Sequence, residues 1–208
     1  MDDRVVVAVY RHGLTEANKN HQYLGWTDSP LCKEEQKRIF QERNAHSSYQ
    51  QYFCSDLSRC TSSLNLLHPK VTPVIMKDFR EMNFGDWEGK TYEELKNEIS
   101  YQDWISSPFT VKPPNGESYL QFTNRVKKGW KKIITMTVKQ GGSKIMLMSH
   151  GGVLRYLISR YSPTKKDFWD IQVPHCGGFE LVWTKNGFWR EEKCILLREV
   201  PITAKQNG

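Results

Sequence analysis

The sequence predicts an α/β fold, a sandwich of helices around a mostly parallel sheet, from three observations. Residues 5–10 (VVVAVY) and 144–148 (KIMLM) are short, continuous apolar runs, which are typical of strands buried on both faces of a parallel sheet. Strand-like and helix-like segments alternate along most of the chain, as parallel strands with crossover helices require. The length of 208 residues fits a single domain over residues 1–208.

Periodicity and helix signals place the elements between these two runs. They are a helix over 33–46, a strand over 52–54, a helix capped by Ser55 or Asp56 that carries Leu57, Cys60, Leu64 and Leu67, a strand over 71–76 and a helix near 91–105. Prolines in 106–118 interrupt the chain. Ser118 and Gln121 are then spaced as a capping box for a long helix, which Gly141 and Gly142 end.

Two further features are expected after the second apolar run. An apolar helix follows Gly152, and Ser162 and Pro163 are typical of the start of another helix, over 163–170. Asn186 and Gly187 stand between two apolar, strand-like runs, which indicates a hairpin. The chain is therefore expected to end on two paired strands.

Composition and charge indicate in which compartment the protein is expected and what kind of partner it binds. The five cysteines form no CxxC pair, which favours free thiols in a reducing cytoplasm. No stretch approaches the roughly 18 apolar residues of a membrane span, and the acidic start lacks the pattern of a signal peptide. The net charge of +7 favours an anionic partner, but no nucleic-acid motif accompanies it. We therefore expect a small anionic molecule, and neither nucleic acid nor membrane, as the partner of a monomer or homodimer.

Polar residues follow three of the expected strands at the point where each strand ends. These residues are Arg11-His12-Gly13, Ser55-Asp56 with Arg59 one turn later, and Ser149-His150-Gly151. Ligands bind at the carboxyl ends of the strands of an open parallel sheet, so two arginines and two histidines should meet at one edge. Guanidinium groups match phosphate oxygens, and a neutral imidazole is a nucleophile near neutral pH. This set predicts phosphoryl transfer onto a histidine, with arginines in place of metal ions.

Two alternatives remain open for the histidines. A two-histidine metal site is the rival interpretation of His12 and His150, but it would need a third ligand. A single histidine is more often structural than catalytic. His175, in VPHCGG, could border the site, but its role is left open.

A series of motifs resembles the histidine phosphatase superfamily, in its phosphoglycerate-mutase-like branch with the RHG motif. In chain order they are RHG, Asn18, GWTDSPL, SDLSR, REMNFGDWEG, PNGES and SHGG. They span about residues 5–180, and FGDWEGKTYEEL especially resembles small bacterial broad-specificity phosphatases and α-ribazole phosphatases. The resemblance implies a three-layer α/β/α sandwich with a mostly parallel central sheet. It also implies a helical cap insertion at about 85–140 that covers the site. Packing of the cap is the expected role for most of its aromatic residues, and an apolar rim of the site is the alternative.

The resemblance also implies a role for each matching residue. His12 matches the nucleophile that becomes phosphohistidine, and Glu81 the proton donor to the leaving oxygen. His150 matches the second histidine, which contacts the phosphoryl group. Four residues match phosphate-binding positions: Arg11, Asn18, Arg59 and Gly151. No cofactor and no metal is implied.

The expected function is therefore a phosphomonoesterase that acts on small phosphorylated metabolites through a phosphohistidine intermediate, without metal. A cofactor-dependent phosphoglycerate mutase is the first alternative, although REMNFGDWEG stands where mutases carry ERHYG. A non-catalytic phospholigand-binding protein is the second. The chain departs from the family pattern at Leu14, Leu24, Cys32 and Glu35, and Leu24 leaves the polarity of the pocket undecided.

Overall fold

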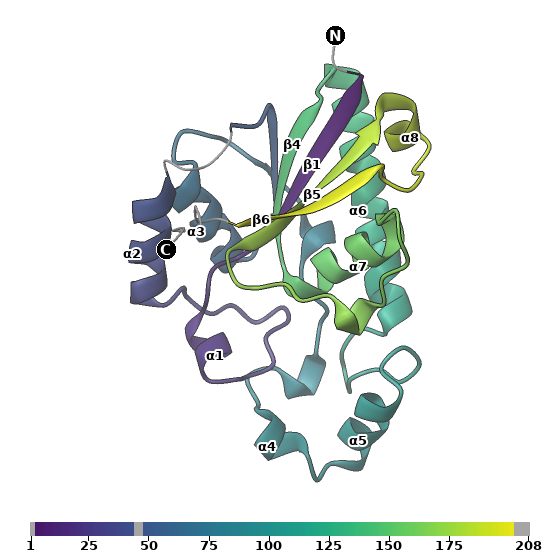
Figure 1. The fold of residues 1–208 in the computed structure, drawn as a ribbon. Helices are drawn as coiled ribbons and strands as arrows, with labels where there is room; N and C mark the ends of the chain where they lie inside the picture. Colours follow the sequence, from purple (N-terminus) through teal and green to yellow (C-terminus); the bar gives the residue numbers. More distant parts are fainter. Residues whose placement is uncertain (1–2, 44–47, 202–208) are drawn as a thin grey trace, which may run out of the picture.

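Six strands form one sheet in the order β3-β2-β4-β1-β5-β6 (Figure 1). The computed structural model describes residues 3–43 and 48–201. The strands are β1 (Arg4–Arg11), β2 (Gln51–Cys54), β3 (Val74–Ile75), β4 (Lys144–Ser149), β5 (Gly177–Thr184) and β6 (Leu196–Pro201). The first four are parallel to one another, and β5 and β6 are antiparallel additions beside β1. The expected mostly parallel sheet is confirmed.

Helices cover both faces of this sheet, which makes three layers (Figure 1). Alternate residues of β1 face opposite sides, as the period of a strand requires. Val7 and Val9 pack with α6 (Tyr119–Gln140) and α7 (Gly151–Tyr161). Ala8 and Tyr10 pack with α2 (Lys33–Glu42) and α3 (Ser58–Leu67). The continuous apolar run of β1 therefore reflects burial on both faces.

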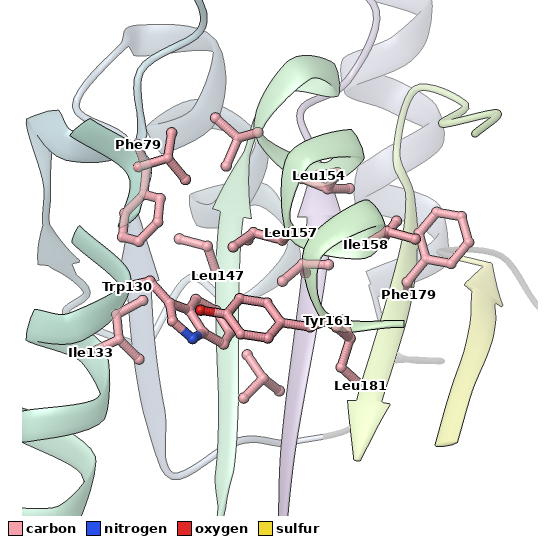
Figure 2. Packing of buried hydrophobic residues seen from close by; sticks show 14 of the residues in the cluster. Phe79, Trp130, Ile133, Leu147, Leu154, Leu157, Ile158, Tyr161, Phe179 and Leu181 are labelled. Atoms are coloured by element: carbon pink, nitrogen blue, oxygen red, sulfur yellow. The ribbon is translucent and has the colours of Figure 1, made fainter. Parts of the chain in front are cut away.

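The larger core cluster lies between the sheet and helices α6 and α7 (Figure 2). Trp130 of α6 stacks on Tyr161 of α7 with ring centroids 5.3 Å apart. Leu147 of β4 and Leu157 of α7 are fully buried in the same cluster. Each such side chain stabilises the fold by about 1.5–3 kcal/mol through burial of apolar surface. This packing holds α7 and α6 against the sheet.

Residues 85–106, part of the chain between β3 and β4, form a small cap at one end of the sheet (Figure 1). The cap contains the 3-10 helix η3 (Gly85–Trp87) and the α-helices α4 (Tyr92–Leu95) and α5 (Ile99–Ser106). The 3-10 helix η2 (Lys77–Phe79), which precedes the cap, packs into the main core through Phe79. Trp87, Leu95, Tyr101 and Trp104 give the cap a core of its own. The helix α6, which also falls within 85–140, packs instead on the sheet through Phe122, Val126, Trp130 and Ile133.

Helix α6 has the ends that its sequence predicts. Ser118 and Gln121 form the capping box, with each side chain bonded to the backbone N–H of the other. Gly141 ends the helix in the left-handed region at φ +66°, a conformation that glycine adopts without strain.

One helix start and the continuity of one helix were predicted wrongly. Helix α3 begins at Ser58 with Leu57 as its N-cap, because Ser55 and Asp56 are occupied elsewhere. Ser55 Oγ bonds His150, and the Asp56 carboxylate pairs with Arg80. The helix near 91–105 is in fact two helices, α4 and α5. The end of the helix expected over 33–46 lies outside the described residues, and α2 ends at Glu42.

The connections near the C-terminus also differ from expectation. Ser162 is the C-cap of α7 and begins no helix, because Pro163 follows a helix end as readily as it begins one. The segment 163–170 contains only the 3-10 helix η4 (Phe168–Asp170). Strands β5 and β6 do pair, but α8 (Lys185–Trp189) joins them and not a tight Asn-Gly turn. The side chain of Thr184 caps α8 by accepting from Gly187 N–H.

Among the helices of residues 3–43 and 48–201, none combines the length and apolar character needed to cross a bilayer.

Candidate active site

The carboxyl ends of β1 and β4 bring two histidines together. The strands pair in parallel with Arg11 opposite Ser149, and His12 N–H donates to Ser149 O at 3.0 Å. His12 and His150 follow these residues, and their ring centroids lie 5.2 Å apart, edge to face. The structure thus places both predicted histidines at one edge of the sheet.

The imidazole of His12 is held in one tautomer. Nδ1 lies 2.7 Å from Gly13 O, and a carbonyl can only accept, so Nδ1 carries the proton. Nε2 therefore keeps its lone pair. Burial, followed by the charges of Arg59 and Arg11, lowers the pKa of His12 well below its usual range. His12 is consequently neutral at pH 7.

His150 has a protein partner at each ring nitrogen. Arg59 Nε donates to His150 Nδ1 at 3.3 Å, so Nε2 carries the proton and lies 2.9 Å from Ser55 Oγ. Cys60 Sγ lies 3.4 Å from the same Nε2. Burial, and then the charge of Arg59, lowers the pKa of His150 well below its usual range, so this ring is neutral as well.

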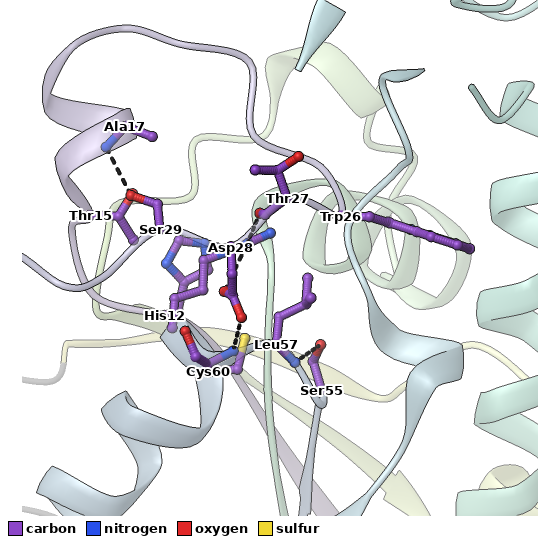
Figure 3. A network of polar contacts seen from close by, with 12 residues as sticks. His12, Thr15, Ala17, Trp26, Thr27, Asp28, Ser29, Ser55, Leu57 and Cys60 are labelled. Carbon is purple, nitrogen blue, oxygen red and sulfur yellow. Dashed lines mark hydrogen bonds and ion pairs between the residues drawn. The ribbon is translucent and has the colours of Figure 1, made fainter. Parts of the chain in front are cut away.

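The guanidinium of Arg59 is fully buried and fixed from three sides. Besides the bond to His150, Nη1 donates to Thr27 O at 3.0 Å and Nη2 donates to Gly25 O at 2.6 Å. Its nearest carboxylate oxygen belongs to Asp28, at 3.6 Å. Asp28 itself accepts from Ser58 N–H at the start of α3 (Figure 3). Arg59 therefore depends on the loop of residues 25–28 for its orientation.

Glu88, from the cap, holds that loop. Its Oε1 accepts from Trp26 N–H at 2.8 Å, and its Oε2 accepts from Thr27 N–H at 2.5 Å. Gly25 lies so close that a Cβ there would be 2.3 Å from Glu88 Oε1. Glu88 therefore supports Arg59 indirectly, because it holds the backbone of the loop whose carbonyl groups accept from the Arg59 guanidinium.

Arg11 forms no ion pair with a carboxylate of the described residues. Its Nη1 donates to Val173 O at 2.7 Å, and its buried Nε has no partner among the described residues. Burial is the main cause that lowers its pKa to about 10. Gly151, the first residue of α7, lies against it, since a Cβ there would be 3.5 Å from Arg11 Cζ. A buried guanidinium with an unused donor beside a helix N-terminus is suited to an anion.

Glu81 lies at the same helix N-terminus. Its Oε2 accepts from Gly152 N–H at 2.9 Å, and its Oε1 accepts from Met82 N–H at 2.9 Å. Its backbone carbonyl accepts from Trp26 Nε1 at 3.0 Å and from Arg125 Nη2 at 3.1 Å. Backbone and side chain are both held, so the carboxylate has a defined position beside α7.

Asn18 makes its side-chain hydrogen bond to Thr15, beside the turn that follows β1. It belongs to α1 (Glu16–Lys19), and its Oδ1 accepts from Thr15 Oγ1 at 2.9 Å. Among the described residues, no hydrogen bond joins it to Arg11, His12, Arg59 or His150.

Leu14 and Glu35, which depart from the family pattern, contact each other at the turn that follows His12. The Oε1 of Glu35 accepts from Leu14 N–H at 3.1 Å, and the carboxylate also pairs with Arg38. Gly13 leaves room for it, since a Cβ there would lie 3.0 Å from Glu35 Cγ. These contacts hold the turn that follows β1. Leu24 is buried.

His175 borders the site, which its motif alone did not establish. Its ring centroid lies 5.6 Å from that of His12. Its Nδ1 is buried and has no partner in the described part of the chain. Burial, and then the charge of Arg11, lowers its pKa to about 4. Glu88 was missed as part of the site, because it acts on a loop distant in sequence. Ser55 was expected at this edge of the sheet, but its bond to His150 was not. Over the described ranges, no group of three or more His, Cys, Asp or Glu side chains could hold a metal ion.

Comparisons with known proteins agree with this fold. Residues 7–194 match the family model of the histidine phosphatase superfamily (branch 1). An adenosylcobalamin/alpha-ribazole phosphatase of Salmonella typhimurium is 30% identical over 199 residues, which cover 88% of this chain and 97% of that protein.

Two solved structures show the same architecture. A putative alpha-ribazole-5'-P phosphatase from Escherichia coli superposes with a TM-score of 0.80 over 98% of both chains, at 23% identity. A phosphoglycerate mutase from Bacillus anthracis superposes with a TM-score of 0.72 at 25% identity, over 88% of this chain and 89% of its own.

Proposed function

Because the chain belongs to the histidine phosphatase superfamily (branch 1), we propose that it is a phosphatase that hydrolyses small phosphomonoesters through a phosphohistidine on His12, without metal. One observation carries the proposal. A neutral histidine with its Nε2 lone pair available stands beside the guanidinium groups of Arg11 and Arg59, and Arg11 Nε has no partner among the described residues. A nucleophile beside two cations, one of which has an unused donor, suits attack on a phosphate ester.

The first step transfers the phosphoryl group to His12. The lone pair of Nε2 forms a bond to phosphorus while the bond between phosphorus and the ester oxygen breaks. The protonated carboxyl group of Glu81 gives its proton to that oxygen, so the leaving group departs as an alcohol. Arg11, Arg59 and the N-terminus of α7 offset the charge on the phosphoryl oxygens.

The second step hydrolyses the phosphohistidine. A water molecule attacks phosphorus, and the Glu81 carboxylate takes one of its protons. The bond between nitrogen and phosphorus breaks, its electron pair returns to Nε2, and inorganic phosphate leaves. Glu81 is then protonated again, ready for the next turnover.

Trapping the intermediate tests this function. The enzyme is mixed with a phosphate-labelled p-nitrophenyl phosphate and quenched in alkali, in which phosphohistidine survives. We expect label on wild-type protein and none on a His12→Asn variant. His21→Asn is the matched control, since His21 is exposed and its φ of 56° suits asparagine. Equal hydrolysis by wild type and His12→Asn contradicts the proposal.

The same preparation separates phosphatase from mutase. A mutase interconverts phosphoglycerates rapidly once a bisphosphate has primed its histidine, whereas a phosphatase releases inorganic phosphate. We expect phosphate release to dominate. A phospholigand-binding protein would retain labelled phosphate without any turnover.

A further inference from the structure

A large cavity lies beside Glu81, between the cap and the sheet. Its volume is about 810 Å³, and Glu81 and Gly152 line it at the start of α7. Aromatic side chains make up much of the remaining wall, among them Tyr23, Phe84, Trp104, Phe109, Phe168 and Trp169. The residue proposed to protonate the leaving group therefore faces a space that the leaving group would enter.

Only two charged residues, Glu81 and Arg155, line this cavity within the described part of the chain. Arg155 lies one turn after Gly151 on α7, about 6 Å further along the helix axis. Its Nε donates to Ile171 O at 3.0 Å, and its guanidinium lies 5.9 Å from the ring centroid of Trp169. No carboxylate within the described ranges lies at ion-pair distance from it. The position of Arg155 is thus fixed, while its charge is uncompensated.

These walls favour one kind of leaving group. Aromatic side chains bind planar rings by offset or edge-to-face stacking, which a small aliphatic alcohol cannot use. A guanidinium beside apolar surface gains most from an anionic partner, because its charge is poorly solvated there. A cavity of this volume also falls within the range of sites that enclose ring-containing ligands.

We propose that the cavity binds the leaving group of the substrate, and that this group is a planar aromatic ring whose anionic substituent, such as a carboxylate, pairs with Arg155. The inference rests on the proposed phosphatase function and specifies its substrate class. Arg155 is then the residue that distinguishes anionic from neutral aryl esters, while the aromatic wall distinguishes aryl from alkyl esters.

A matched pair of substrates tests the role of Arg155. The two esters are 4-carboxyphenyl phosphate and 4-carbamoylphenyl phosphate, which have nearly the same shape and differ in charge. The ratio of their kcat/KM values is measured for wild type and for Arg155→Gln, so that the difference in intrinsic reactivity cancels. We expect the preference for the carboxylate to fall at least tenfold in Arg155→Gln.

Arg160→Gln is the control variant, since it removes the same charge from an exposed position of the same helix. We expect its ratio to equal that of wild type. An unchanged ratio in Arg155→Gln, or an equal fall in both variants, overturns the proposal. If the phosphatase function itself is wrong, neither ester is hydrolysed and His12 carries no label, which is a different result.

The aromatic wall has its own test. Trp169 is 47% exposed at the wall of the cavity, so Trp169→Ala should leave the fold intact. We expect the ratio of kcat/KM for phenyl phosphate to that for glycerol phosphate to fall several-fold in this variant. Equal losses on both substrates would show that the aromatic wall does not select the leaving group.

Discussion

Arg59 donates from Nε to Nδ1 of His150 at 3.3 Å, so a single side chain sets the tautomer of the second histidine. The other two nitrogens of the same guanidinium bond backbone carbonyls of Gly25 and Thr27. Three acceptors in three directions require a planar fork of donors, which lysine does not have.

Arg59→Lys is therefore expected to behave as a severe change although the charge is kept. We expect kcat/KM for p-nitrophenyl phosphate to fall by 100-fold or more, because the orientation of His150 and the proposed binding of phosphate by the guanidinium are lost together. Urea denaturation should also show a loss of about 1–3 kcal/mol, since buried carbonyls lose their donors. Arg190→Lys, at an exposed position, is the control. Activity within threefold of wild type would contradict this account of the site.

Glu88 is predicted to be a positioning residue that acts through the loop of residues 25–28. In Glu88→Gln one amide oxygen replaces two carboxylate oxygens, so at least one backbone N–H of Trp26, Thr27 or Phe84 faces another donor. We expect a higher KM and weaker inhibition by inorganic phosphate, because Arg59 loses its support. Glu93→Gln should change neither value, since Glu93 is an exposed glutamate of the same cap. A fall in stability with unchanged KM and phosphate inhibition would mean that Glu88 is only structural.

Acid should destabilise the protein through its buried histidines. Their pKa values in the folded state are lower than 6.5, so the unfolded chain takes up protons first as the pH falls. The free energy of unfolding therefore decreases below about pH 6.5, and the contribution of His175 stops growing near its folded pKa of about 4. At ~1.4 kcal/mol per pH unit, His175 alone accounts for up to about 2 kcal/mol by about pH 5.

Urea unfolding of wild type and His175→Asn between pH 7.5 and pH 5 measures this contribution. We expect a shallower pH dependence in the variant, because a group that titrates only in the unfolded chain has been removed. Parallel curves for the two proteins would show that His175 titrates alike in both states.

Gly85 is predicted to be required for the cap. Its φ of +55° disfavours other residues, and a Cβ there would lie 2.0 Å from Pro114 O and 2.5 Å from Gly116 N. Gly89 is the matched control, because its φ is +81° but nothing lies within 4 Å of a Cβ. Thermal unfolding should show a loss of about 1 kcal/mol for Gly89→Ala and a clearly larger loss for Gly85→Ala. Equal losses would mean that conformation alone, and not crowding, sets the cost.

Local patterns predicted the elements whose signals are local. The buried runs of β1 and β4, the capping box of α6 and the polar residues at the strand ends depend on neighbours in sequence, and the structure confirms them. One of the failures has a cause that lies far away in the sequence. Ser55 was expected to cap α3, but its hydroxyl bonds His150, which is 95 residues away. Local sequence propensity cannot predict a hydrogen-bond partner that only the tertiary fold brings close.

By itself, the sequence determined the edge of the sheet at which polar residues gather, because strand direction and the ends of apolar runs follow from the order of residues. Only the tertiary structure decided which nitrogen of His150 carries the proton, that Glu88 supports Arg59, and that Arg155 faces an aromatic cavity. The tautomer of His150, the support of Arg59 and the cavity beside Arg155 all depend on contacts between segments far apart in the chain. Such contacts exist only when the helices are packed on both faces of the sheet and the cap lies at the end of the sheet.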